Sequence, residues 1–437
     1  MKFRSLLNER TLVSLREVLF RGLAPDGSLY VPEEIPPIPA TVLNADPAAT
    51  LPAIASQIIA PYIDDVPLSA IQTMAERAFD FPIPLVPLEQ DLYLLELFHG
   101  PTLAFKDIGA RFMASALSYF LEQDQQDLTI AVATSGDTGS AVAQGFFRVP
   151  RITVYVLYPA GRISPLQEQQ ITTVGENIQA VEVEGSFDDC QRIVKMALVD
   201  PELSRAHNLT TANSINLGRL IPQITYYFWA LLQLRWSRDV PGSTMPVDIC
   251  VPSGNFGNIT AAAYAKRMGA PVSTLIAASN ANATVPEYFS TGLFNPRASV
   301  QTYSNAMDVG NPSNFVRLLA LYANSLDAIR QDVFPASISD AETLGEIRRT
   351  YEHSGLVLDP HSAVGVAAAR RFRQLHTSPR PTIVAATAHP AKFPDVISKA
   401  LGIAIPLPAQ LEEALRRTKK STRLPAEYAR FKDLLLP

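Results

Sequence analysis

The chain has 437 residues, of which 47% are hydrophobic and 18% are charged, and its formal net charge is -5. This length and balance are typical of a globular protein of two or three domains, and no basic excess predicts a nucleic-acid partner. Cys190 and Cys250 stand apart, with no C-x-x-C or His-rich spacing, so we expect neither a disulfide framework nor a metal site.

The sequence gives no sign of export or of membrane insertion. Charged and polar residues at positions 8–10 interrupt the apolar core that a signal peptide needs. No run reaches the roughly 18 apolar residues of a membrane helix. We therefore expect a cytoplasmic protein without a membrane partner. We also expect it to be a monomer or a homodimer.

Residues 1–85 are predicted to form a small, mainly helical N-terminal cap. Prolines cluster between positions 32 and 39 and again between positions 82 and 87, which marks two breaks in the chain. Between these breaks, residues 53–60 and 67–79 have mixed helical spacing of apolar residues.

From residue 92 onward, short apolar runs alternate with longer amphipathic stretches. Buried strands are predicted at residues 128–133, 152–157, 178–183, 247–251, 274–278 and 382–386. Helices are predicted over 190–198, opened by the capping sequence 186–189, and over 217–236. This alternation predicts an α/β fold with two parallel-sheet domains, at 86–215 and 216–437.

Lys106 is the first candidate for chemistry, because it lies in the apolar run 101–109 just before a helical pattern. An amine in apolar surroundings has a lowered pKa, and its neutral form can act as a nucleophile or a base. A lysine at a helix start can equally lay its stem on the core and keep its charge in water. Taken alone, the run favours this second interpretation.

Two glycine-rich turns strengthen the case for chemistry. Residues 130–139 and 249–258 both read as an apolar strand, then Ser-Gly-x-x-Gly, then a helix. Such a turn presents free N–H groups at the positive end of a helix and can hold an anion. The 253–258 turn carries no charge and suits a phosphate, whereas Asp137 makes the 135–139 turn better suited to a weaker anion or a hydroxyl. Each turn alone could also be a tight connection and no more.

Neither turn matches the nucleotide triphosphate loop, the dinucleotide fingerprint or the nucleophile elbow. A lysine in an apolar segment combined with an uncharged phosphate loop points instead to pyridoxal phosphate. The aldehyde of this cofactor bonds to a lysine amine, and its phosphate needs a cradle of N–H groups.

The combination resembles the threonine synthase family, within the tryptophan-synthase-β-like, fold type II pyridoxal-phosphate enzymes. The resemblance rests on residues 21–32, 99–109, 134–139, 212–216, 252–258, 304–310 and 387–393. It therefore extends from near the start of the chain to about residue 400. Residues 5–11 depart from the Ser-Thr-Arg-Gly stretch that many members carry near the start.

The resemblance implies that Lys106 is the lysine that bonds to the cofactor and also the catalytic base. It implies that the cofactor is further bound by Asp137, Ser253, Gly254, Asn255, Phe256, Gly257, Asn258 and Thr387, with the Thr387 hydroxyl near the pyridine nitrogen. Substrate contacts are implied for Ser135, Thr138, Asn213, Ser214 and Asn216. For the polar residues at 213–216, a purely structural role in turns has similar weight.

The implied reaction converts O-phospho-L-homoserine and water to L-threonine and phosphate by β,γ-elimination and β-hydration. The substrate phosphate needs a cationic pocket, for which Arg111, Arg219 and Lys392 are the candidates. Two alternatives stay open: a phospho-lyase on the same scaffold that releases a 2-oxo acid and ammonia, and a non-catalytic protein that binds pyridoxal phosphate.

Overall fold

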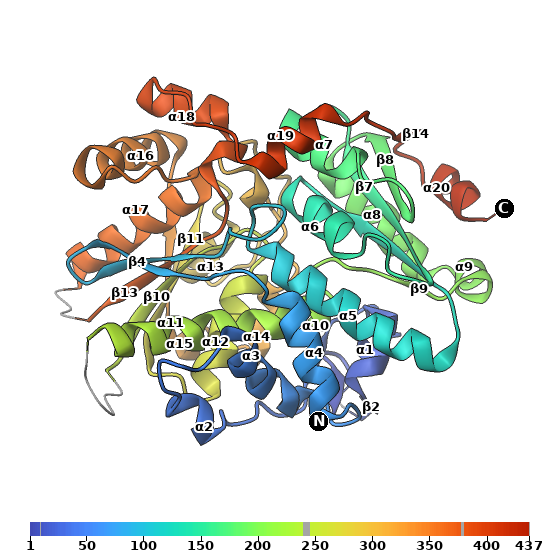
Figure 1. The fold of residues 1–437 in the computed structure, drawn as a ribbon, viewed down its shortest axis with the longest axis horizontal. Helices are drawn as coiled ribbons and strands as arrows, with labels where there is room; N and C mark the ends of the chain where they lie inside the picture. The colour runs from blue at the N-terminus through green and yellow to red at the C-terminus, as the bar shows by residue number, and fades with distance from the viewer. Residues whose placement is uncertain (9, 239–244, 377–379, 437) are drawn as a thin grey trace.

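The computed structural model describes residues 1–8, 10–238, 245–376 and 380–436. Two separate, mainly parallel sheets lie on opposite sides of the molecule, and helices cover their faces (Figure 1). The predicted α/β class with two parallel sheets is therefore confirmed.

The larger sheet has six strands. Their spatial order is β12 (Val333–Ser337), β11 (Val272–Ser279), β10 (Val247–Pro252), β13 (Thr382–Ala386), β5 (Leu92–Glu96) and β4 (Leu85–Glu89). Neighbouring strands are parallel, except that β4 runs antiparallel to β5 at the edge. Every residue of β10 and β13 is buried, as expected of central strands that helices cover on both faces.

The smaller sheet has five strands, all parallel to their neighbours. Their spatial order is β14 (Thr422–Pro425), β8 (Ile178–Glu184), β7 (Ile152–Pro159), β6 (Leu128–Ala133) and β9 (Leu209–Thr210). All six strands predicted from the sequence are present in the two sheets. The strands of these two sheets that the sequence did not reveal are β9 and β14, which are short, the edge strands β4 and β12 of the larger sheet, and β5, which lies next to β4.

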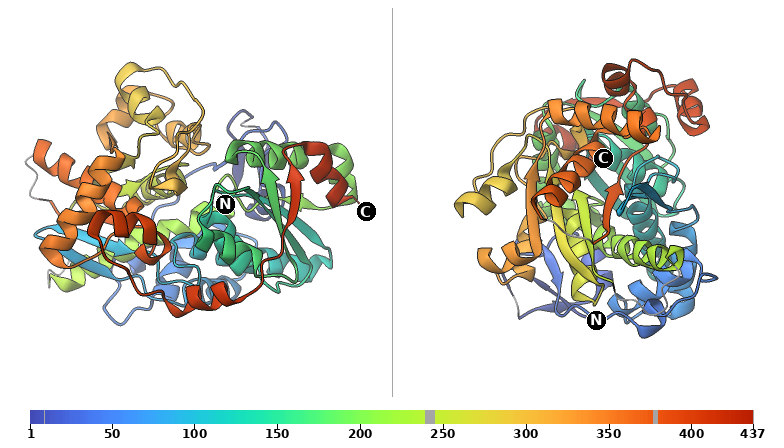
Figure 2. Two further views of the ribbon diagram at one scale, coloured as in Figure 1. Left: turned by 90° about the horizontal axis from the view of Figure 1, so that it is seen from above. Right: turned by 90° about the vertical axis from the view of Figure 1, so that its left-hand side faces the viewer.

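Sheet membership crosses the division predicted at residues 85 and 215. β5 follows residue 85 but pairs with β13 of the larger sheet. β14 lies near the C-terminus but pairs with β8 of the smaller sheet. The C-terminal segment reaches β14 by running from one side of the molecule to the other (Figure 2). The sheets therefore do not follow the continuous boundaries 1–85, 86–215 and 216–437.

The N-terminal region combines helices with a small antiparallel sheet. The sheet has the order β2 (Leu12–Val13), β1 (Phe3–Ser5) and β3 (Tyr30–Pro32). The helices are α1 (Leu15–Arg21), α2 (Ala40–Leu43), α3 (Leu51–Ile59), η1 (Ala60–Tyr62) and α4 (Leu68–Ala78). α3 and α4 correspond to the two predicted helices, and the Thr50 hydroxyl caps α3.

The remaining helices connect or cover the strands. They are α5 (Lys106–Asp124), α6 (Asp137–Gly145), α7 (Pro165–Thr172), α8 (Phe187–Val199), α9 (Pro201–Ala206), α10 (Leu217–Leu220), η2 (Ile221–Gln223), α11 (Ile224–Ser237), α12 (Gly257–Arg267), α13 (Thr284–Thr291), η3 (Asn305–Met307), α14 (Phe315–Leu321), α15 (Leu326–Asp332), α16 (Asp340–Ser354), α17 (Pro360–Leu375), η4 (Pro390–Lys392), α18 (Pro394–Leu401), α19 (Ala409–Arg416) and α20 (Tyr428–Leu435). α8 begins with the predicted capping box of Ser186 and Asp189. None of the helices within the described ranges is long and apolar enough to cross a bilayer.

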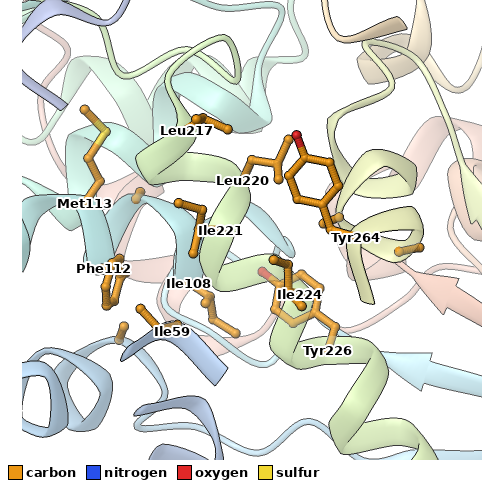
Figure 3. Close-up of a cluster of buried hydrophobic side chains, with 14 of the residues drawn as sticks. Ile59, Ile108, Phe112, Met113, Leu217, Leu220, Ile221, Ile224, Tyr226 and Tyr264 are labelled. Atoms are coloured by element: carbon orange, nitrogen blue, oxygen red, sulfur yellow. The ribbon is translucent and has the colours of Figure 1, made fainter. Parts of the chain in front are cut away.

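The single helix predicted over residues 217–236 is divided into α10, η2 and α11. Pro222 lies in the first turn of η2, and it lacks the N–H that a continuous helix needs at that point. α10 and η2 still pack against α5, and α11 packs against α3 and α12. The buried side chains that meet there are Ile59, Ile108, Phe112, Met113, Leu217, Leu220, Ile221, Ile224, Tyr226 and Tyr264 (Figure 3). This core fixes the start of α5 relative to α12.

Candidate active site

A cavity lies at the carboxyl ends of three parallel strands. β6 ends at Ala133, β10 at Pro252 and β13 at Ala386, and residues that follow each strand line the cavity. Because β6 belongs to one sheet and β10 and β13 to the other, the cavity lies between the two sheets. Ligand sites of open α/β sheets occur at this end of the strands. The structure thus brings together Lys106 and both glycine-rich turns.

Lys106 is the first residue of α5 and lies on the cavity wall. The Phe105 N–H donates to the carbonyl oxygen of Thr387 over 2.9 Å, which joins the start of α5 to the end of β13. Burial lowers the pKa of the Lys106 amine to about 8, although the Asp137 carboxylate opposes this shift. A larger fraction of the amine is therefore neutral near pH 7, as imine formation or proton abstraction requires.

The turn over 253–258 leaves the first turn of α12 without a side-chain cap. Its N-cap residue, Phe256, makes no capping hydrogen bond, and its φ of 60° is in the left-handed region. The Phe256 ring packs edge-on against Phe315, with 5.5 Å between ring centroids. A Cβ atom on Gly254 would lie 2.6 Å from the Cα of Met307, so only glycine allows this close approach of the two backbones. The turn therefore offers main-chain N–H groups to an anion.

The polar side chains of the same turn bond to the protein and hold its shape. Asn258 donates from Nδ2 to Oε1 of Gln223 over 2.9 Å, and its Oδ1 accepts from the Tyr227 hydroxyl over 2.5 Å. The Ser253 hydroxyl donates to the carbonyl oxygen of Val251 over 2.8 Å. Anion binding is thus left mainly to the backbone of the turn.

These features fit pyridoxal phosphate. The Lys106 amine, the uncapped N-terminus of α12 and Thr387 all line one cavity. The uncharged turn suits the cofactor phosphate, and Thr387 supplies a neutral hydroxyl at the end of β13, as the resemblance implies for the pyridine nitrogen.

In the 134–139 turn, a side chain of the turn itself accepts hydrogen bonds from two of the backbone N–H groups. Thr134 accepts at Oγ1 from the N–H groups of Gly136, over 2.9 Å, and Gly139, over 2.7 Å. Gly136 has a φ of 133°, and a Cβ atom there would collide with the Gln167 side chain. Ser135 and Thr138 line the cavity, where the sequence places substrate contacts.

Asp137 does not stand unpaired in this turn. Its Oδ1 accepts from Lys392 Nζ over 2.6 Å and from Gln167 Nε2 over 3.0 Å. Burial raises the pKa of the Asp137 carboxyl, but the neighbouring positive charges, foremost Lys392, lower it well below its usual value. The carboxylate is therefore charged but neutralised within the protein.

Lys392 lies outside the cavity, although the sequence made it a candidate for binding the substrate phosphate. Its side chain is fully buried, and Nζ donates to the carbonyl oxygen of Thr102 over 3.0 Å as well as to Asp137. Lys392 is not among the cavity-lining residues. Its ammonium group is committed to the protein and unavailable to a substrate phosphate.

Asn213 and Asn216 both bond to the backbone. Asn213 donates from Nδ2 to the carbonyl oxygen of Ala133 over 2.7 Å and accepts from the Ala133 N–H over 3.0 Å, so it fixes the end of β6. Asn213 lines the cavity. Asn216 is fully buried outside the cavity lining, where it caps α10 and donates to the carbonyl oxygen of Leu19. The structural interpretation of Asn216 is the one that its contacts support.

The two arginine candidates differ sharply. Arg219 is buried on the cavity wall and donates to the carbonyl oxygens of Ala212, over 2.5 Å, and Lys106, over 3.4 Å. No carboxylate in the described part of the chain lies within ion-pair distance of Arg219, and its Nε is buried without a partner. Burial lowers the pKa of Arg219 to about 10. Arg111 does not reach the cavity, because it pairs with Asp80 outside it.

Two cavity contacts were missed by sequence reasoning. The N–H of Ala306 donates to Nε2 of His361 over 3.1 Å, and Nδ1 of His361 lies 2.7 Å from Asp359 Oδ1. This arrangement places the proton of a neutral His361 ring on Nδ1. Gln167, which holds Asp137, lies 30 residues away from it, and no local pattern predicts the pair.

Helix α8 forms a further wall that the sequence could have revealed. Phe187, Gln191 and Lys195 line the cavity at intervals of four residues, which places them on one face of a helix. The helix was predicted, but no role was assigned to this face.

Comparisons with known proteins identify the family and its cofactor. Residues 79–387 match the family model described as pyridoxal-phosphate dependent enzyme. Residues 2–79 and 362–435 match the models of the threonine synthase N terminus and of threonine synthase, C-terminal. The cofactor expected from the sequence is thus confirmed.

Individual relatives are similar over the whole chain. A threonine synthase of Haemophilus influenzae is 40% identical over 97% of each chain. The crystal structure of threonine synthase from Escherichia coli has a TM-score of 0.92 at 38% identity and covers 100% of this chain and 99% of its own. A structure of PLP-bound threonine synthase from Brucella melitensis has a TM-score of 0.91 at 36% identity, covering 100% of this chain and 98% of its own. The chain therefore belongs to the threonine synthase family of pyridoxal-phosphate-dependent enzymes.

Proposed function

We propose that this protein is a lyase that converts O-phospho-L-homoserine and water to L-threonine and phosphate. The observation that carries the proposal is that one cavity contains Lys106 and two positions suited to bind anions. The uncapped N-terminus of α12 provides one position, and Arg219 provides the other, because it is a buried cation without a carboxylate partner among the described residues. The first suits the cofactor phosphate and the second the substrate phosphate.

Lys106 is the residue that we assign to proton transfer. Bound pyridoxal phosphate supplies the electron sink that makes the substrate α proton acidic. The neutral amine of Lys106 removes the α proton and afterwards the β proton, because it lies on the cavity wall with a pKa lowered to about 8. Residues 253–258, Asp137 and Thr387 would hold the cofactor in reach of this amine.

The substrate phosphate is assigned to polar groups around Arg219. Ser135, Thr138, Asn213 and Ser214 line the same cavity and offer neutral donors, whereas Arg219 supplies the charge. A phosphate dianion in a mostly buried site needs both, since an unpaired charge there is strongly disfavoured. Phosphate then leaves the γ carbon, which takes up a proton and becomes the methyl group, while water adds its hydroxyl at the β carbon and a proton returns to the α carbon.

A product assay tests the reaction. Purified protein with pyridoxal phosphate and O-phospho-L-homoserine should release phosphate and L-threonine in equal amounts. Release of phosphate with 2-oxobutanoate and ammonia would instead establish the phospho-lyase alternative. Binding of the cofactor without turnover of any phosphorylated amino acid would favour the non-catalytic alternative. The cytoplasmic location and the monomeric or homodimeric state stay predictions.

A further inference from the structure

A buried ion pair lies beside the lysine that we assign to catalysis. Lys392 has no solvent exposure, Asp137 is 3% exposed, and Lys392 Nζ lies 2.6 Å from Asp137 Oδ1. The second bond of Nζ, to the carbonyl oxygen of Thr102, ties the pair to the segment that leads into α5. The reaction as proposed assigns no role to Lys392.

The ion pair matters because Asp137 and Lys106 line the same cavity. A carboxylate close to an amine stabilises the protonated amine, and a buried carboxylate does so more strongly than an exposed one. Asp137 acts on Lys106 in this direction, whereas Lys392 acts in the opposite direction. After Lys392, Lys106 is the group that most favours the charged form of Asp137.

We propose that Lys392 is a positioning residue that serves as the counter-ion of Asp137, so that this carboxylate does not hold a proton on Lys106. The pair carries no net charge, and Asp137 Oδ1 is already shared by Lys392 and Gln167. Asp137 can therefore stand in the cavity wall without fixing Lys106 as an ammonium group.

The other charged groups around Lys106 do not take over this role. Arg219 of α10 is a cation and favours the neutral amine, and Lys195 of α8 is an exposed cation on the cavity lining. His361 of α17 brings no carboxylate to Lys106, and its Nε2 accepts from the Ala306 N–H. Asp107 of α5 accepts from the Thr102 N–H over 2.9 Å and from the Thr102 hydroxyl over 2.6 Å, and it is not among the residues that line the cavity.

The test measures the protonation of Lys106 directly in the full-length protein freed of cofactor. An amine-reactive reagent is applied over a range of pH, and mass spectrometry of the Lys106 peptide gives the rate of labelling. The midpoint of the rate against pH reports the pKa of the amine. The same proteins loaded with pyridoxal phosphate are titrated with pH and followed by their absorption spectrum.

The two single variants should shift the midpoint in opposite directions. Lys392→Met leaves Asp137 without its counter-ion, so the midpoint rises by about one pH unit or more, equivalent to about tenfold slower labelling below it. Asp137→Asn leaves the Lys392 charge unpaired, so the midpoint falls. Asp137→Asn combined with Lys392→Met returns it toward the original value. Lys392→Arg, which keeps the charge, stays nearer to the original protein than Lys392→Met.

Lys266→Met is the control, because it removes a lysine that pairs with Asp332 away from the cavity. Equal midpoints in the original protein, both single variants and the double variant would overturn the proposal. If Lys392→Met does not fold, Asp137→Asn and the double variant still decide it. The inference rests on the proposed role of Lys106, but labelling needs no turnover, so a failed product assay and a failed midpoint shift are distinguishable.

Discussion

Ser214 and Asn255 join the segment before α10 to the 253–258 turn. Asn255 donates from Nδ2 to the Ser214 hydroxyl oxygen over 2.8 Å, and Asn314 donates to the same oxygen over 3.0 Å. A hydroxyl oxygen accepts two hydrogen bonds, so both acceptor positions of Ser214 are taken. Its own hydrogen remains as a donor on the cavity wall, which suits an anionic ligand and not a cation.

Ser214→Ala should therefore weaken use of the phosphorylated substrate. The change removes one donor and leaves two amide groups without their acceptor, a loss of about 1–3 kcal/mol. We expect kcat/KM to fall by about 10- to 100-fold, mainly through a higher KM, as measured by steady-state phosphate release. Ser290→Ala, an exposed change on α13, serves as the control. A KM within twofold of the original would contradict the assignment of Ser214.

Lys106→Ala should abolish both the imine absorbance and turnover. The amine is the group in the cavity whose burial favours its neutral, reactive form. Loss of a positioned acid–base group lowers rates by about 100- to 10,000-fold, and loss of the nucleophile adds to this. The measurements are the visible spectrum with added pyridoxal phosphate and the rate of threonine formation. An unchanged absorbance band would show that another amine bonds to the cofactor.

The parts of the fold that could be predicted from the sequence have local signals. β6 and β10 are short apolar runs followed by glycine turns, and each turn opens a helix, so strand, turn and helix start are encoded within about ten residues. Lys106 could be singled out for the same reason, because its apolar neighbours are adjacent in sequence. The family resemblance then supported the prediction further, because several family-like blocks follow one another in order along the chain, and no single turn provides that information.

The parts that could not be predicted depend on contacts between distant residues. Lys392 and Asp137 are 255 residues apart, and nothing near either one shows that they meet. Arg111 lies two residues beyond a block typical of the family, yet its side chain pairs with Asp80. The assignment of β14 to the smaller sheet depends on a crossing of the C-terminal segment, which short strand signals do not encode.

Gly254→Ala should weaken cofactor binding. A Cβ atom at this position would lie 2.6 Å from the Cα of Met307, so one of the two backbones must move, and the 253–258 turn that we propose for the cofactor phosphate would distort. We expect the Kd for pyridoxal phosphate, measured by spectroscopic titration, to rise by about tenfold or more, as follows from a loss of about 1.4 kcal/mol.

Gly345→Ala is the matched control for this change. Gly345 lies within α16 and a Cβ atom there meets nothing within 4 Å. Alanine in place of glycine inside a helix stabilises it by roughly 0.5–1 kcal/mol, so Tm should rise slightly while cofactor affinity stays the same. Equal Kd values for pyridoxal phosphate in the Gly254→Ala and Gly345→Ala variants would show that residues 304–307 can move aside without disturbing the 253–258 turn.

Asp308 holds the loop whose neighbouring residues form part of the cavity wall. Its Oδ1 accepts from the Thr302 hydroxyl over 2.7 Å, from Asn280 Nδ2 over 2.9 Å and from Asn282 Nδ2 over 3.2 Å, and its Oδ2 accepts from the Thr302 N–H over 3.0 Å. Burial raises the pKa of the Asp308 carboxyl to about 6, although the bonds from Thr302 oppose the shift. All four bonds need an acceptor.

Asp308→Asn should therefore destabilise the protein. The NH2 group of the new asparagine would face groups of Thr302, Asn280 or Asn282 that are themselves hydrogen-bond donors. A loss of about 1–3 kcal/mol in the free energy of unfolding is expected at pH 7, measured by denaturant titration. The raised pKa of Asp308 means that the folded state binds the proton more tightly than the unfolded state. Protonation of Asp308 therefore stabilises the folded state. This stabilisation is fully present below the unfolded pKa of 3.8 and is lost as pH rises through the folded pKa of about 6.

The stability difference between the original protein and Asp308→Asn should consequently narrow as pH rises from 4 to 6. Other titrating groups are the same in both proteins and cancel in the difference. Asp327→Asn, a change at a highly exposed carboxyl, should give a small difference that varies little over this range. A difference that widens with pH would mean that the charged form of Asp308 is the one that the folded protein prefers, against the effect of its burial.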